Sequence, residues 1–132
     1  MRNICAKQIL LVDDEMKYLN TLAEDLQASD GSLHILTAEN GERALDLLES
    51  AQVDLVVTDL KMPVMDGFEF ISRVKKSYPN MPVIVMSIFT SPQVKKNLLA
   101  LGVSQCIEKF NLKALEDGIL RTMGSGYLEG NR

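Results

Sequence analysis

The chain has 132 residues and a formal net charge of −4, with 46% hydrophobic and 24% charged residues. This length and balance are typical of one globular domain with its own core and exclude two independent domains. The acidic net charge argues against direct nucleic acid binding and against binding to anionic membranes, since both need a basic surface.

Two features indicate the compartment. Cys5 and Cys106 form neither a CxxC motif nor a disulfide framework, which is typical of a reducing environment. No apolar run is long enough to span a bilayer, and the start of the chain turns acidic too soon for a signal peptide. We therefore expect a cytoplasmic protein that does not insert into a membrane.

Short apolar runs alternate with helical patterns along the chain. The runs predict β-strands at residues 7–12, 33–37, 53–58, 82–87 and 103–108. Between them, apolar residues recur at helical spacing. This spacing predicts helices at 15–28 and 41–50, and then around 68–78, 94–101 and 112–119.

This alternation predicts an α/β fold in which right-handed crossovers build a five-stranded parallel sheet with helices on both faces. The commonest strand order in such a doubly wound, flavodoxin-like sheet is 2-1-3-4-5. We expect this domain to span residues 5–123. The glycine-rich segment 124–132 is predicted to be a flexible tail or the start of a linker.

Polar residues stand at the carboxyl ends of the predicted strands, where open parallel sheets bind ligands. They are Asp13 and Asp14 after the first strand, Asp59 after the third, Ser87 at the end of the fourth, and Lys109 after the fifth. Neighbouring strands lie about 4.8 Å apart, so the three aspartates should share one pocket. Carboxylates this close repel one another unless a cation joins them, and Mg²⁺ suits because it keeps room for a phosphate.

These residue types together fit a phosphoryl-transfer site. The metal ion and Lys109 would neutralise oxygens of the transferred group, and Asp59 would be the nucleophile. Pro63 and Gly67 predict a shaped loop, in which Gly67 supplies a backbone conformation closed to other residues. A single aspartate at a strand end is usually only a helix cap or turn residue. The hypothesis of a phosphoryl-transfer site therefore depends on the combination of Asp59 with Asp13, Asp14, Ser87 and Lys109.

Four segments, "LLVDDE", "VVTDLKMPVMDGFEF", "PVIVMS" and "CIEK", together resemble the response-regulator receiver domains of two-component signalling. The resemblance implies that Asp59 accepts a phosphoryl group from the phosphohistidine of a histidine kinase, with Mg²⁺ required. The implied metal ligands are Asp13, Asp14, Asp59 and the backbone carbonyl of Lys61. Ser87 would move to bond the phosphoryl group, and Lys109 would pair with it.

The resemblance also implies partners. Such a receiver is not a conventional enzyme, because it catalyses only its own phosphorylation and dephosphorylation. A histidine kinase or phosphotransfer protein would act before it, and a downstream protein or fused output domain after it. Dimerisation through the face of the fourth helix, fifth strand and fifth helix is a further implied association. The bulk of Lys61 and Phe89 beside the path of the attacking water predicts slow loss of the phosphoryl group.

Three positions depart from the family pattern. The family usually has a proline in a cis peptide after the lysine, whereas Phe110 follows Lys109 here. Either this bond is trans and the loop is rebuilt, or strain is stored beside the site. The fifth strand usually carries an aromatic switch residue where this chain has Cys106, which is too small for that role. Ile88 stands where the family prefers a small residue, and it should narrow access to the site.

Three functions are compatible with parts of this pattern. The complete acidic site favours a phosphorylatable receiver that regulates a partner. Cys106 and the missing proline favour a degenerate receiver that acts as a phosphorylation-independent docking module. A phosphatase of the aspartate-nucleophile type would need a second aspartate two residues after the first, where this chain has Lys61. The first hypothesis is preferred.

Overall fold

The computed structural model describes residues 7–88 and 90–130. In chain order its elements are β1 (Lys7–Val12), α1 (Met16–Ser29), β2 (Leu33–Ala38), α2 (Gly41–Ser50), β3 (Leu55–Thr58), α3 (Gly67–Ser77), β4 (Val83–Ser87), α4 (Pro92–Ala100), β5 (Gln105–Glu108) and α5 (Leu112–Gly130). All paired strands are parallel, and the sheet order is β2-β1-β3-β4-β5. The predicted fold class and strand order are confirmed.

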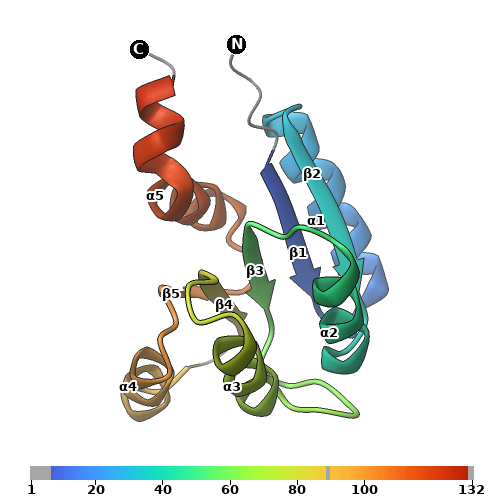
Figure 1. Ribbon diagram of the computed structural model, residues 1–132, viewed down its shortest axis with the longest axis vertical. Coiled ribbons are helices and arrows are strands. Elements are labelled where there is room, and N and C mark those ends of the chain that lie inside the picture. The colour runs from blue at the N-terminus through green and yellow to red at the C-terminus, as the bar shows by residue number, and fades with distance from the viewer. Residues whose placement is uncertain (1–6, 89, 131–132) are drawn as a thin grey trace.

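Alternate side chains along each strand enter two separate hydrophobic cores. On β1, Leu10 and Val12 belong to one core, while Ile9 and Leu11 belong to the other. Buried residues of α2, α3 and α4 pack in the first core, and those of α1 and α5 in the second. Figure 1 shows the resulting layers of helix, sheet and helix. Because both faces are covered, the strands appear in the sequence as continuous apolar runs.

Two predicted strand starts are wrong for local reasons. β3 begins at Leu55, because the Gln8 N–H donates to the Asp54 carboxylate at 2.8 Å instead of to a backbone carbonyl, although the Asp54 N–H still donates to the Gln8 carbonyl at 2.8 Å. β5 begins at Gln105, because the N–H of Val103 donates to the Leu98 carbonyl and completes the end of α4. Apolar patterns alone do not show where such competing hydrogen bonds interrupt a strand.

The last helix is longer than predicted. α5 continues to Gly130, so the backbone of 124–130 is helical where a tail or linker was expected. A domain boundary at 123 stays a prediction. Within the described ranges, no helix is long and apolar enough to cross a membrane.

Candidate functional site

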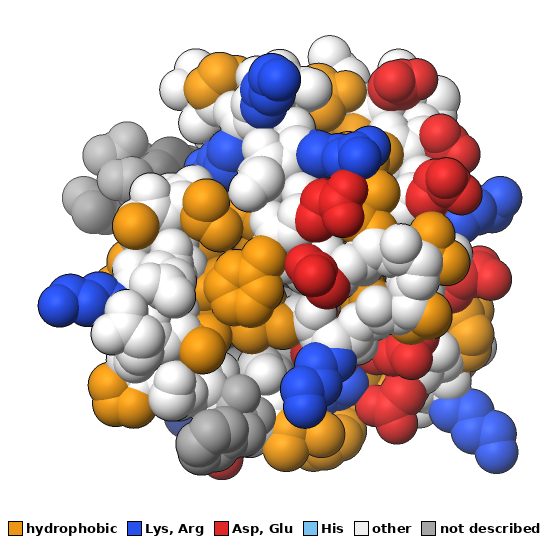
Figure 2. Space-filling view, turned by 90° about the horizontal axis from the view of Figure 1, so that it is seen from below, with side chains coloured by type: hydrophobic (Ala, Val, Ile, Leu, Met, Phe, Trp, Pro, Cys, Tyr) orange, Lys and Arg blue, Asp and Glu red, His pale blue; other side chains and the backbone are white. Residues whose placement is uncertain are grey.

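The sheet register places the carboxyl ends of β1 and β3 side by side. Val12 pairs with Thr58, so the next residues, Asp13 and Asp59, leave the sheet together. The N–H of Asp59 donates to the Val12 carbonyl at 3.0 Å. The arrowheads of β1 and β3 point to the lower end of the molecule in Figure 1, and Figure 2 looks onto that end. Acidic side chains gather on one half of this face, beside a group of hydrophobic ones.

Three aspartates converge at this edge, as predicted. Asp13, Asp14 and Asp59 each offer a carboxylate oxygen, and these oxygens all lie within 4.8 Å of one another. Asp13 and Asp59 are buried, while Asp14 is exposed. Hard oxygen donors at this spacing suit a small divalent cation that retains several waters. The donor set therefore fits the expected Mg²⁺, and the ligand role of the Lys61 carbonyl stays a prediction.

The Lys109 ammonium lies among three carboxylates. Its Nζ is 2.7 Å from Asp13 Oδ2, 2.9 Å from Glu15 Oε1 and 3.0 Å from Asp59 Oδ2. An ammonium has three N–H donors, so these acceptors match its full capacity. The Lys109 side chain is only 2% exposed, which distinguishes its contacts with the buried Asp13 and Asp59 from ordinary surface ion pairs.

Backbone hydrogen bonds fix the same side chains. Lys109 follows the Ser87–Glu108 pair of the sheet, and its N–H donates to the Ser87 carbonyl at 2.9 Å. Asp13 Oδ1 accepts the Glu15 N–H at 3.0 Å. Asp59 Oδ1 accepts the N–H of the next residue at 2.7 Å, which leaves Oδ2 directed at the lysine. The reactive groups are therefore held by the ends of the strands themselves.

Burial and ion pairing shift the pKa values of Lys109 and Asp13. Burial alone would lower the pKa of Lys109, but its hydrogen bonds to Asp13, Glu15 and Asp59 outweigh burial and raise the pKa. Burial raises the pKa of Asp13, and the hydrogen bond from Lys109 opposes that shift. The three carboxylates therefore favour the charged form of Lys109.

A cleft of about 690 Å³ opens beside Asp59. Ser87 is buried at the end of β4 and lines this cleft, and Ile88 lies at its rim with 66% exposure. The complete lining is Asp59, Leu60, Lys61, Met62, Asp66, Phe68, Ser87, Ile88, Ser91 and Val94. The structure thus brings Lys61 and Ser87 to the same opening as Asp59. Phe89, predicted to flank the path of water, lies outside the described residues.

Gly67 is required for space rather than for an unusual backbone angle. Its φ is not positive, so the conformational role predicted for it is wrong. A Cβ atom there would lie 2.6 Å from the Leu60 Cα and 2.7 Å from the Asp59 carbonyl oxygen. The Gly67 N–H donates to the Leu60 carbonyl at 2.7 Å, and Asp66 caps α3. The start of α3 therefore packs directly on the strand end that carries Asp59.

The turn after Lys109 is rebuilt. The described part of the chain contains no cis peptide bond, so Phe110 follows Lys109 through a trans bond. Phe110 adopts φ 71°, in the left-handed region that few side chains occupy. Of the two alternatives left open by the sequence, the trans bond is correct, and the unusual backbone angle falls on Phe110.

Cys106 is half-buried and lines a second hollow between β5 and the start of α4. This hollow is lined by Ser87, Ile88, Thr90, Lys95, Cys106, Ile107 and Glu108. Burial raises the pKa of the Cys106 thiol, although nearby Lys95 opposes the shift. The position that would carry a switch ring thus faces unfilled space.

The sequence did not point to Glu15 or Tyr18. Glu15 contacts Lys109, and its place directly after two aspartates was a usable signal. The ring of Tyr18 lies 5.2 Å from Lys109 Nζ, although Tyr18 belongs to α1. No local pattern reveals that contact, because a half-buried tyrosine in the first turn of a helix is ordinary.

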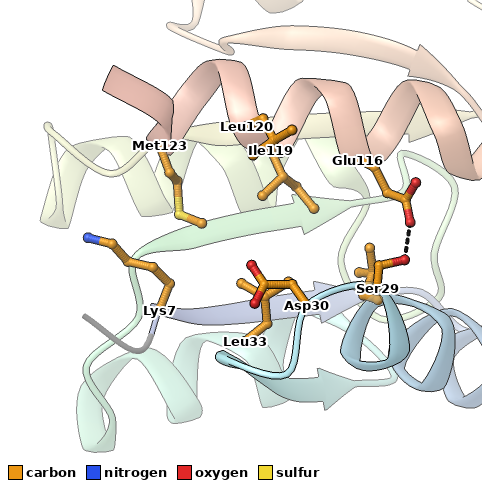
Figure 3. Close-up of a pocket in the computed structure, with 9 residues that line it drawn as sticks. Lys7, Ser29, Asp30, Leu33, Glu116, Ile119, Leu120 and Met123 are labelled. Atoms are coloured by element: carbon orange, nitrogen blue, oxygen red, sulfur yellow. Dashed lines mark hydrogen bonds between the residues drawn. The ribbon is translucent and has the colours of Figure 1, made fainter. Parts of the chain in front are cut away.

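A separate hollow of about 250 Å³ lies at the opposite edge, where β1 and β2 begin (Figure 3). It is lined by Lys7, Leu26, Ser29, Asp30, Leu33, Glu116, Ile119, Leu120 and Met123. Ser29 donates to Glu116 across its rim, which ties α1 to α5. None of the predicted site residues lines this hollow.

The acidic pocket and the buried lysine lie at the carboxyl end of the five-stranded parallel sheet, where such sheets bind ligands, and the pocket is consistent with a phosphoacceptor site. The model of the response regulator receiver domain family matches residues 9–119. The chain therefore belongs to that family, whose members are signalling modules rather than conventional enzymes.

Individual relatives agree with this membership. The heme response regulator HssR of Staphylococcus aureus is 35% identical over 109 residues, which cover 82% of this chain and 47% of that protein. The chemotaxis protein CheY4 of Vibrio cholerae is 30% identical, with a TM-score of 0.83 over 89% of this chain and 99% of that chain. TrrA of Thermotoga maritima, solved with Mg²⁺ and BeF, is 31% identical, with a TM-score of 0.78 over 88% and 98%. The chain spans about half the length of the curated relatives it matches.

Proposed function

We propose that this receiver domain takes a phosphoryl group from a phosphohistidine onto Asp59, with Mg²⁺ as cofactor. The observation that carries the proposal is the buried Asp59 carboxylate, 3.0 Å from Lys109 Nζ and in one pocket with Asp13 and Asp14. Burying a carboxylate is costly unless other groups compensate its charge. A strand end that gathers several acids around one lysine suits a reacting group better than a structural one.

In the proposed transfer, an Asp59 oxygen attacks the phosphorus atom while the bond from phosphorus to the histidine nitrogen breaks, and that electron pair stays with the imidazole. Lys109, already 3.0 Å from Asp59 Oδ2, donates hydrogen bonds to the transferred oxygens. The Ser87 hydroxyl, at the cleft beside Asp59, donates a hydrogen bond to one of the same oxygens. A Mg²⁺ ion, when bound by Asp13, Asp14, Asp59 and the Lys61 carbonyl, would supply positive charge to the same oxygens.

The phosphodonor we propose is a histidine kinase or a phosphotransfer protein, because the family takes its phosphoryl group from phosphohistidine. Phosphorylation would then switch an interaction with a downstream protein or with a fused output domain. Dimerisation through α4, β5 and α5 and a cytoplasmic location stay predictions. The acidic net charge continues to argue against direct nucleic acid binding.

The decisive experiment is incubation with acetyl phosphate and Mg²⁺, followed by intact-mass spectrometry. We expect the parent protein to gain one phosphoryl mass and Asp59→Asn to gain none. Asp25→Asn, which changes an exposed aspartate of α1, is the matched control and should gain the same mass as the parent. A phosphorylated Asp59→Asn protein would show that another residue accepts the group.

One observation favours a second candidate, a docking module that does not depend on phosphate. Cys106 faces a hollow instead of filling it with a ring, so the usual lever between the site and the α4–β5 surface is missing. The same mass experiment separates the two functions. A parent protein that gains no phosphoryl mass would favour the docking module.

A further inference from the structure

Two aromatic rings lie against the Lys109 ammonium in addition to its three carboxylates. Its Nζ is 5.2 Å from the centroid of the Tyr18 ring and 5.7 Å from that of Phe110. Both distances lie in the range where a ring face attracts a cation, and the attraction grows where water is excluded. Because the Lys109 side chain is almost fully buried, the rings are a substantial part of its surroundings.

The two rings also contact each other. Their centroids are 5.0 Å apart and their planes meet at 78°, an edge-to-face arrangement that favours aromatic pairs. Tyr18 comes from the first turn of α1, and Phe110 from the turn between β5 and α5. The pair therefore joins two segments that are far apart in the sequence, directly beside the lysine.

The backbone of Phe110 is also tied to Tyr18. A left-handed φ of 71° is unfavourable for a residue with a Cβ atom and needs support from its surroundings. The Phe110 N–H donates to the Tyr18 hydroxyl oxygen at 3.4 Å, and that hydroxyl lies 3.9 Å from the Met86 sulfur. A proline in place of Phe110 could not make this bond, because proline has no N–H.

We propose that Tyr18 is a positioning residue for Lys109. Its ring holds the ammonium toward Asp59, and its hydroxyl holds the turn that begins at Phe110. This inference rests on the proposed phosphoryl transfer and adds a residue to it. A lysine side chain is flexible and loses conformational freedom when it contacts the transferred group. If Tyr18 already restrains the Lys109 side chain, less of that freedom is lost in the transition state.

The test compares Tyr18→Leu, which removes ring and hydroxyl, with Tyr18→Phe, which removes the hydroxyl alone. In the parent, the rings should shift the NMR signals of the Lys109 methylene group next to Nζ upfield. In Tyr18→Leu these signals should move downfield toward the position of an exposed lysine, with the Phe110 ring keeping part of the upfield shift. Phosphorylation by acetyl phosphate at saturating Mg²⁺ should become about tenfold slower, since a desolvated cation–ring contact is lost. Tyr18→Phe should keep the lysine signals, stay within about threefold of the parental rate, and move the Phe110 amide signal.

Tyr78→Leu is the matched control, because it removes another half-buried tyrosine, at the end of α3. It should leave the Lys109 signals and the rate unchanged. Phe110→Leu removes an exposed ring and should cause part of the loss. If Tyr18→Leu does not fold, the Phe110 amide signal in Tyr18→Phe still tests the contact of the Tyr18 hydroxyl with the turn. The inference would be overturned if the Lys109 signals of Tyr18→Leu matched those of Tyr78→Leu. A parent protein that is not phosphorylated would overturn the proposed function instead, and the Lys109 signals would still report on Tyr18.

Discussion

Lys109 organises the charges of the site, but it cannot neutralise them. Its single ammonium contacts Asp13, Glu15 and Asp59, and Asp14 adds a further carboxylate within 4.8 Å of two of them. Excess negative charge therefore remains in a partly buried pocket. Such an excess attracts a divalent cation. Lys109 and the proposed Mg²⁺ ion would thus have complementary roles at the same strand ends.

This balance gives a prediction for Asp14, the exposed member of the cluster. Asp14→Ala should weaken Mg²⁺ binding by at least about tenfold, because the metal loses a hard oxygen ligand. Asp25→Ala, on the exposed side of α1, removes the same charge away from the site and should bind Mg²⁺ like the parent. Mg²⁺ titrations followed by the amide signals of Asp13 and Asp59 give both affinities. Equal affinities for Asp14→Ala and Asp25→Ala would show that the metal assignment is wrong.

At the scale of helices and strands, the sequence predicts the elements whose apolar residues recur at regular spacing. Apolar runs located all five strands. The convergence of Asp13, Asp14 and Asp59 followed from the strand order alone. The Tyr18–Phe110 pair did not, because it depends on a left-handed backbone angle that only tertiary contacts stabilise. The helical backbone after residue 123 was not predicted either, since glycine-rich composition favours coil.

The junction of β3 and α3 gives a prediction about packing. Gly67→Ala should reduce the free energy of unfolding by about 1–3 kcal/mol, because the added methyl group would overlap the backbone of Asp59 and Leu60. Gly31→Ala is the matched control, since a Cβ there meets nothing within 4 Å and the φ is not positive. Urea unfolding of both variants measures the difference. A Gly67→Ala protein as stable as Gly31→Ala would mean that the two elements are not held this closely.

At the scale of the whole molecule, two of the contacts that join the site to the rest of the fold differ in their packing. One passes from Lys109 to α1 through Tyr18 and Phe110. The other passes from Ser87 of β4 to the neighbouring strand β5, which carries Cys106 and borders the hollow beside α4. The first contact is packed and hydrogen-bonded, whereas the second lacks a side chain that could fill two alternative positions. A change at Asp59 should therefore reach α1 more readily than it reaches α4.

That difference leads to a prediction about the switch. A ligand shifts an equilibrium only by its differential affinity for the two states, so a missing ring at position 106 should reduce the shift. A beryllofluoride mimic of the phosphoryl group should perturb amide signals strongly around Asp59, Ser87 and Lys109, and only modestly in α4 and β5. Cys106→Tyr should enlarge the response of α4 and β5, because the hollow lined by Thr90 and Lys95 gives a ring room to enter. Cys106→Ser, which adds no ring, should respond like the parent. Large changes throughout α4, β5 and α5 in the parent protein would show that another side chain already acts as the lever.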